Sequence, residues 1–532
     1  MRILIFHGYL LGGTGSNVYN ARLAEALVRL GHEVHLLSQD RHPDEYQFID
    51  AAGDWDDGTL RVRPLRAADA DQPVRCTVYR PDIGGLLPVY VADRYEGVEA
   101  RTFADCSDEE VERYIEANVA AVAELLVLVR PEVALANHLV MGPVILARAL
   151  AGEVPYAVKI HGSALEYTVK PQPQRFLGAA SEGLRGARAI LVGSRHTAES
   201  LWQALSAEGE ALRARTRLGP PGVDVERFSP RDGPAAAAGV DALVRRLASS
   251  EAHSAPASAF ARDQGAAALA LGRLDPGHDR LVAFVGKLIV SKGVDLLIAA
   301  WPLVLEEVPR ARLVVVGFGA YRQGLERLTA ALLAGDVGQA REIALAGRTL
   351  EAPSSDADQL GDARPLGHLL AFLEGLHGQA LERYLQAASG LGDAVVLTGR
   401  LDHEELAELL PACEALVVPS TFPESFGMVA AEAAACGVLP VSAAHSGLAD
   451  VSDALARAVP ERAASWLSFP VDDNAVSALA ARLEGWLTAD PALRSSTRAG
   501  LVATVRERWS WDGVARGVIA AASGELDRLG KP

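Results

Sequence analysis

Two stretches of the chain follow the same order: a short apolar run, a glycine-rich turn, a helical pattern and another apolar run. The first begins at residues 2–6, with a turn over residues 7–17 and a helix ending at Gly31. The second begins at residues 282–285, with a turn over residues 286–293. Strands that alternate with helices form mostly parallel sheets covered by helices. The sequence therefore predicts two doubly wound α/β domains.

The break at Pro220-Pro221-Gly222 lies between the two patterns, and prolines stiffen such a junction. We expect an N-terminal domain over residues 1–222 and a C-terminal domain over residues 223–508. Two segments of the second domain depart from the alternating pattern and are expected to be insertions, partly helical: residues 231–280 and 320–392. A last helical segment, residues 509–532, is expected to pack back on the N-terminal domain.

Polar side chains directly follow several predicted strands of the first domain. They are His7, Asn137, His138, His161 and Ser194. Ligands of parallel sheets bind at the carboxyl ends of the strands, so these residues mark a candidate cleft. A single histidine in such a place is more often structural, and the gathering of several polar residues at one edge favours a site.

The first glycine-rich turn contains Gly13-x-Gly15, and Asp40 follows the second strand. This order is part of a dinucleotide-binding fingerprint, but Val18 stands where its third glycine belongs. The dehydrogenase interpretation is therefore weak. A turn that lets phosphates approach the backbone remains the alternative.

The composition, the net charge and the absence of several motifs argue against some classes of function. Its 532 residues, 49% apolar and 22% charged, are typical of a globular protein, and a net charge of −17 argues against nucleic acid. No apolar run approaches the ~18 residues that span a bilayer. Four scattered cysteines have no metal-type spacing and predict reduced thiols in a cytoplasm. The chain also lacks the phosphate-loop, G-x-S-x-G and H-E-x-x-H motifs.

Only five of the 51 basic residues are lysines, and two of them, Lys287 and Lys292, lie in one six-residue stretch after a predicted strand. Two ammonium groups beside a helix N-terminus would compensate the charge of a leaving diphosphate. Chance, or a local solvated patch, is the alternative.

The segment PSTFPESFGMVAAEAAACGVLP, residues 419–440, predicts a loop and a helix after a buried strand. We expect Glu424 at the helix entry and Glu432 two turns into the helix, on either side of an N-terminus that suits a diphosphate. A nucleotide-sugar has hydroxyls at both ends and phosphates in the middle, which matches this layout. Two ordinary surface glutamates are the alternative.

Taken together, the motifs resemble the retaining glycosyltransferases of family 4. They occur in the family's order: Gly12-Gly13-Thr14-Gly15, His161-Gly162, Pro221-Gly222-Val223-Asp224-x-x-x-Phe228, Gly286-Lys287-Leu288-x3-Lys292-Gly293, and Pro419-Ser420 through Glu424-x7-Glu432. The resemblance implies the GT-B fold, two Rossmann-like domains facing a central cleft. Lys287 stands where the family usually has arginine, and Ser446-Gly447-Leu448-Ala449-Asp450 replaces the usual Gly-Gly-x-x-Glu.

The resemblance also implies roles for individual residues. Lys287 and Lys292 would bind the donor diphosphate, and Glu432 the ribose. Glu424 would hold the donor sugar together with the backbone of the residues that follow it, namely Phe426, Gly427, Met428 and Val429. The loop with Gly13 and Gly15 would approach the phosphates, and His161 would lie beside the sugar.

By the same resemblance, the chain would be a metal-independent enzyme that moves a hexosyl group from a UDP-, GDP- or ADP-sugar to an acceptor hydroxyl. The nucleotide-sugar is then a substrate, no cofactor is expected, and peripheral membrane contact stays open. Two alternatives remain, an epimerase of nucleotide-sugars with the same architecture and a non-catalytic nucleotide-sugar sensor. The sugar, the base, the acceptor and the oligomeric state are not predicted.

Overall fold

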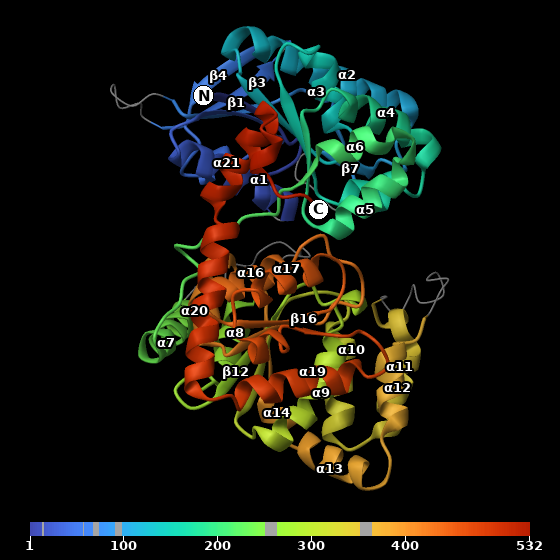
Figure 1. The fold of residues 1–532 in the computed structure, drawn as a ribbon, viewed down its shortest axis with the longest axis vertical. Coiled ribbons are helices and arrows are strands. Elements are labelled where there is room, and N and C mark those ends of the chain that lie inside the picture. Colours follow the sequence, from blue (N-terminus) through green and yellow to red (C-terminus); the bar gives the residue numbers. More distant parts are fainter. Residues whose placement is uncertain (13–14, 57, 67–73, 91–97, 250–262, 352–363) are drawn as a thin grey trace. The chain divides into compact units, whose positions relative to one another are not determined.

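The computed structural model describes the chain except residues 13–14, 57, 67–73, 91–97, 250–262 and 352–363. The chain forms two compact units (Figure 1). Unit 1 consists of Met1–Gly222 and Trp509–Pro532, and unit 2 of Val223–Arg508. The chain thus leaves unit 1 at Gly222, the residue that ends the stiff Pro-Pro-Gly break, and re-enters it at Trp509.

Unit 1 is built on a nine-stranded sheet with the order β11-β10-β9-β8-β1-β2-β5-β3-β4. All neighbouring strands are parallel except β3 and β4. The strands are β1 (Arg2–Phe6), β2 (Glu33–Leu37), β3 (Ala51–Asp56), β4 (Thr59–Pro64), β5 (Cys76–Arg80), β8 (Val133–Asn137), β9 (Tyr156–Ile160), β10 (Ala189–Val192) and β11 (Thr216–Leu218). The strand order reverses between β1 and β8, so a topological switch point lies there.

The sequence of residues 41–106 predicts irregular structure with short strands at residues 60–65 and 75–79. Both strands are present, as β4 and β5, and a further strand, β3, lies between them in the sheet. A separate parallel pair joins β6 (Leu86–Val89) to β7 (Glu99–Thr102). The sequence of β3, AAGDWD, has little intrinsic strand preference. Pairing with both neighbours stabilises it, and that cannot be deduced from a local pattern.

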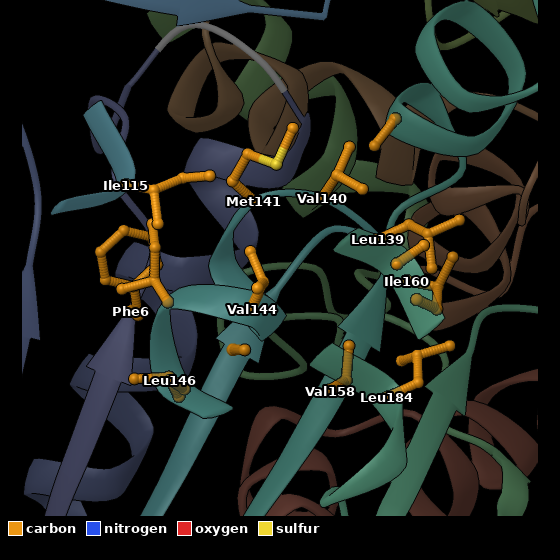
Figure 2. Packing of buried hydrophobic residues seen from close by; sticks show 14 of the residues in the cluster. Phe6, Ile115, Leu139, Val140, Met141, Val144, Leu146, Val158, Ile160 and Leu184 are labelled. Carbon is orange, nitrogen blue, oxygen red and sulfur yellow. The ribbon is translucent and has the colours of Figure 1, made fainter. Parts of the chain in front are cut away.

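Helices cover both faces of the unit 1 sheet. Alternate residues of β1 point to opposite faces: Leu4 and Phe6 belong to one buried cluster, Ile3 and Ile5 to the other. Figure 2 shows part of the first cluster, where Phe6 lies with Ile115 and Val144. It is covered by α2 (Asp108–Val129), α3 (Gly142–Leu150) and α4 (Pro173–Arg185). Ser107 and Glu110 have the S-x-x-E spacing of a capping box, and this box begins α2.

The second face is covered by α1 (Gly15–Arg29) together with the C-terminal helix α21 (Trp511–Ser523). Figure 1 shows α21, in red, beside the blue α1. Trp511 and Val518 are buried in this cluster, and Arg29 of α1 forms an ion pair with Asp512. A Cβ atom at Gly222 would lie 2.4 Å from the Trp511 ring, so glycine is required where the chain leaves unit 1. Residues 509–532 therefore complete the core of unit 1.

Unit 2 contains a six-stranded, fully parallel sheet with the order β14-β13-β12-β15-β16-β17. Its strands are β12 (Arg280–Val285), β13 (Ala311–Val316), β14 (Val395–Gly399), β15 (Ala415–Val418), β16 (Leu439–Ala443) and β17 (Ser468–Phe469). The order reverses between β12 and β15. The loops after these two strands therefore flank the switch point of unit 2, where ligands of such sheets bind.

The two segments expected as insertions contain helices in the part that the structure describes. The first holds α7 (Gly233–Ser249) and α8 (Gln264–Leu271). The second holds α10 (Arg322–Leu333), α11 (Val337–Ala346), α12 (Gly367–Gly375), α13 (Gly378–Ala388) and a short 3-10 helix, η5 (Gly347–Glu351). Within the described ranges, no helix is long and apolar enough to cross a membrane. All four cysteines are buried and unpaired.

Candidate functional site

Two loops meet at the switch point of unit 2. The loop after β12 forms a 3-10 helix, η4 (Val290–Lys292), and then begins α9 (Val294–Glu307) at Gly293. Gly293 has a φ of +65°, and a Cβ atom there would lie 2.0 Å from the carbonyl oxygen of Pro419. Thr421, in the loop after β15, donates its backbone N–H to Ser291 O at 2.9 Å. The glycine allows the two backbones to touch, so the residues on both loops are held close together.

Lys292 and Glu424 join these two loops by an ion pair. Ser420 donates its hydroxyl to the same carboxylate oxygen of Glu424 at 2.6 Å. Both charged side chains keep part of their surface accessible, 29% for Lys292 and 25% for Glu424. An ammonium group has three donors, so a lysine that gives one to Glu424 retains donors for an anion. Lys287 is exposed on the same loop.

The backbone of Glu424 is fixed by the loop after β16. Ser446, the first residue of α17 (Ser446–Ala456), accepts the Glu424 N–H at 2.9 Å, and Gly447 donates to Glu424 O at 2.8 Å. His445 Nε2 lies 2.8 Å from Ser420 O, and its Nδ1 lies 3.1 Å from the Ser446 hydroxyl. These contacts fit a ring that donates at Nε2 and accepts at Nδ1. Ser446 has a φ of +54°, a backbone conformation that costs a non-glycine residue energy.

The predicted position of Glu432, two turns into the helix that Glu424 enters, is wrong. α16 (Met428–Ala435) begins four residues after Glu424, so Glu432 lies little more than one turn from the helix start. Residues 424–427 are loop, because Pro423 and Gly427 disfavour helix around them. The surface alternative for Glu432 is also wrong, since the residue is only 4% exposed.

His403 accompanies Glu432, and the sequence did not single it out. It is the first residue of α15 (His403–Leu409), which begins with a capping box of Asp402 and Glu405. Its Nε2 lies 3.0 Å from Glu432 Oε1, and its ring meets the edge of Phe228 at 5.8 Å between centroids. The available signal was its place just after β14, at the carboxyl edge of the sheet.

The N-terminus of α16 contributes backbone donors. Gly427 is its N-cap and is buried, while Phe426, Met428 and Val429 are half-buried. The N-cap glycine has no side chain with which to cap the first turn of this helix. The first N–H groups of a helix have no partners within the helix and favour an anion. Unit 2 thus brings the predicted lysine, the acid pair and a helix N-terminus to one edge of one sheet.

The glycine-rich turn of unit 1 is only partly described. Gly13 lies outside the described residues, and Gly15 is the exposed first residue of α1. Asp40 accepts the backbone N–H groups of Leu11 and His42, each at 2.9 Å. The carboxylate thus holds the turn itself, which weighs further against the dinucleotide interpretation, in which that acid binds a ribose.

A chain of hydrogen bonds connects the ends of β1, β8 and β9. Asn20 of α1 donates to His7 Nδ1 at 3.0 Å and accepts from Asn137 Nδ2 at 2.7 Å. Asn137 Oδ1 in turn accepts from His161 Nε2 at 2.8 Å. His7 Nε2 lies 2.9 Å from both Leu10 O and Asn17 Oδ1. His7 therefore donates at Nε2 and accepts at Nδ1, which is the neutral form.

Three histidines gather at this edge, and all are uncharged at neutral pH. Burial lowers the pKa of His7 to about 4 and holds the pKa values of His138 and His161 well below the ordinary range. His138 has a φ of +69° and is 1% exposed. Neither of its ring nitrogens has a hydrogen-bond partner among the described residues. Among all the residues that the structure describes, no group of three or more His, Cys, Asp or Glu side chains could hold a metal ion.

Comparison with known protein families gives two matches. A model described as "Glycosyl transferase 4-like domain" matches residues 14–213. A model described as "Glycosyl transferases group 1" matches residues 273–338 and 375–497. Together they account for most of both units. Residues 339–374 lie between the two matched parts of the second model and outside both.

Among curated relatives, the D-inositol 3-phosphate glycosyltransferase of Segniliparus rotundus is 30% identical over 259 residues, 49% of this chain and 42% of the relative. The enzyme of the same name from Frankia alni is 28% identical over 318 residues, 59% of this chain and 57% of the relative. The chain spans about half the length of these relatives.

Among solved structures, sucrose-phosphate synthase from Thermosynechococcus elongatus has a TM-score of 0.54 at 19% identity, covering 99% of this chain and 98% of the other. HepE from Anabaena, in complex with UDP and glucose, has a TM-score of 0.52 at 13% identity, covering 98% and 99%. At such identities the likeness establishes the fold.

Proposed function

Since the chain belongs to the family 4 type of glycosyltransferases, with the Rossmann-like domains of the GT-B fold, we propose that it moves a hexosyl group from a nucleoside-diphosphate sugar to an acceptor hydroxyl. One observation carries this proposal: Lys292 and Glu424 are paired where the two loops of the unit 2 switch point meet. The anomeric configuration would be retained, and no metal ion or cofactor would be needed.

In this proposal the donor lies along the carboxyl edge of the unit 2 sheet. Lys292, with Lys287 on the same loop, compensates the negative charge that grows on the diphosphate as the glycosidic bond breaks. The N-terminus of α16 supports the same phosphates. Glu432 binds the ribose hydroxyls, and its contact with His403 fixes the orientation of the carboxylate. Glu424 binds the sugar, next to the carbon where positive charge develops.

The polar edge of unit 1 would receive the acceptor. Neutral imidazole and amide groups suit hydroxyls, which both donate and accept hydrogen bonds. The roles of His161, Gly13 and Gly15 beside the donor stay predictions. The names of the relatives make D-inositol 3-phosphate the first acceptor to test, and the complexes of HepE make UDP-glucose the first donor. The four unpaired buried thiols support a cytoplasmic location as part of the proposal.

A panel of UDP-, GDP- and ADP-sugars, incubated with acceptor pools and followed by mass spectrometry, tests the proposed function. We expect a new glycoside together with release of the nucleoside diphosphate that depends on acceptor. Activity should persist in excess EDTA, because lysines replace the cation. Proton NMR of the product then reports whether the configuration is retained.

Two results would contradict the proposal in different ways. An epimerase would convert the donor sugar whether or not acceptor is present. A sensor would bind the donor and show neither transfer nor slow hydrolysis. Loss of turnover in EDTA that Mg²⁺ or Mn²⁺ restores would overturn the metal-independent part alone.

A further inference from the structure

A contact from outside the family match reaches the loop that carries Lys287 and Lys292. Glu351 ends η5, within the unmatched residues 339–374. Its carboxylate oxygen Oε1 accepts the backbone N–H of Val290 at 2.5 Å. Val290 is the first residue of η4, and no side chain from within its own loop caps η4. Glu351 therefore acts as the cap of η4 from 61 residues away in the sequence.

The segment that carries Glu351 is fixed on both sides. At Gly347, with φ of +54°, a Cβ atom would lie 2.0 Å from the carbonyl oxygen of Arg364. Leu366 donates its N–H to Ala344 O at 2.8 Å. On the side of α10, a Cβ atom at Gly324 would lie 3.3 Å from Leu350 Cβ. Because η5 packs this closely, the position of Glu351 is set by the insertion and not by the loop it contacts.

Other contacts hold the neighbouring residues of this loop. Leu288 donates its N–H to Phe318 O at 2.8 Å, Ser291 O accepts from Thr421 at 2.9 Å, and Lys292 pairs with Glu424. The N–H of Val290, between these points, is held by Glu351. Removing Glu351 would leave the N–H of Val290 without its acceptor and η4 without its cap. A segment with fewer hydrogen bonds opens more often. The ammonium groups of Lys287 and Lys292, which act only if they are positioned before the reaction, would then lose their fixed positions.

We propose that Glu351 is a positioning residue of the donor site, by which η5 (Gly347–Glu351) holds the loop of Lys287 and Lys292 in the geometry that binds a nucleoside diphosphate. Both lysines lie in residues 273–338, which the family model matches, whereas Glu351 lies outside the match. The ligand named here rests on the proposed function, whereas the support of the loop does not.

The test compares three full-length variants. Glu351→Ala removes the acceptor, and Glu351→Gln keeps an amide oxygen that can still accept the Val290 N–H. Glu374→Ala is the matched control, because Glu374 is an exposed acid of α12 in the same insertion. Hydrogen exchange of peptides covering residues 286–293 and calorimetric binding of UDP, GDP and ADP are measured for each, with thermal unfolding to verify the fold.

We expect Glu351→Ala to speed exchange in this loop and to weaken binding of the preferred nucleoside diphosphate about tenfold, the size of one lost hydrogen bond to a charged group. Glu351→Gln should lie between the parent and the alanine variant, and Glu374→Ala should match the parent. Unchanged exchange in Glu351→Ala would overturn the proposal, and so would faster exchange with unchanged affinity. If the parent binds none of the three nucleotides, the proposed function fails, and the exchange comparison alone decides whether Glu351 supports the loop.

Discussion

The two units share one strand order around their switch points but differ in the chemistry of the carboxyl edge. In unit 1 the network at the ends of β1, β8 and β9 is neutral and mostly buried, with His7, Asn20, Asn137 and His138 each at most 1% exposed. In unit 2 the carboxyl edge carries an ion pair, Lys292 with Glu424, that keeps a quarter or more of each side chain accessible. The same topology thus presents hydrogen-bonding groups without charge in one unit and charged groups in the other.

The difference shows that the fold sets where a ligand binds and the loop residues set what it is. A buried neutral network makes a mutation costly to folding, because each lost partner leaves a polar group unpaired. Accessible charges on supported loops can be altered at little cost to folding. We therefore expect site mutations in unit 1 to act on stability and those in unit 2 to act on turnover.

The largest expected effect is that of Lys292→Ala in unit 2. Loss of one preorganised charge at a leaving group should lower kcat by about 10²–10³-fold. The free energy of unfolding should change by less than about 1 kcal/mol, because the side chain is partly exposed. Steady-state kinetics and denaturant unfolding check both statements, with the exposed Lys531→Ala as control. Near-normal turnover would end the assignment of Lys292 to the diphosphate.

The second prediction concerns unit 1 in acid. His7 has its pKa lowered to about 4 in the folded chain, so between pH 6.5 and 4 the unfolded chain takes up the proton first. Stability should fall across this window, by about 3 kcal/mol for His7 alone. A His7→Gln variant should lack this share of the pH dependence in denaturant titrations. The exposed His278→Gln serves as control, and equal slopes for parent and His7→Gln would contradict a neutral buried ring.

The third prediction separates the two acids of unit 2. Glu424→Gln should lower kcat, because its contact with the sugar strengthens as positive charge develops. Glu432→Gln should raise the KM for donor, since contacts to the ribose hardly change during reaction. Each effect should be about tenfold, as for one charged hydrogen bond. Kinetics against donor concentration decide, and the opposite pattern would mean that the donor lies in the reverse direction.

The smallest effect is expected for Ser446→Gly. Glycine relieves the backbone cost of a φ of +54° but removes the hydroxyl that accepts the Glu424 N–H. These two contributions oppose each other, so the free energy of unfolding should change by less than about 1 kcal/mol. Ser446→Ala keeps the backbone cost and loses the hydroxyl, and should be the less stable variant. If Ser446→Ala is as stable as Ser446→Gly, the backbone at this position is not strained.

Local signals in the sequence were enough for much of the fold. The capping boxes at Ser107 and Asp402 begin α2 and α15, and the residues after β12 and β15 form the site in unit 2. These features depend on residues within about five positions of each other. The pattern of glycine and lysine in 286–293 likewise placed Lys292 on the correct edge.

Contacts between distant segments were beyond such reasoning. The partner of Glu432 is His403, 29 residues earlier, and the place of His403 just after β14 does not tell which side chain it contacts. The network through Asn20 and Asn137 spans 117 residues and uses amides, which occur in many roles. The helix start at Met428 depended on how far the loop after β15 extends, and helix boundaries are the least certain part of any pattern.

The return of the chain to unit 1 has a consequence for its synthesis. Trp511 and the rest of α21 fill one face of the unit 1 sheet, yet the ribosome makes them only after all of Val223–Arg508. At translation rates of about 5–20 residues per second, that interval is roughly 15–60 s. During it the apolar residues that α21 covers, on α1, β8, β9 and β10, lack their partner helix. The nascent N-terminal sheet is then a natural client for chaperones, while unit 2 can fold as soon as it emerges.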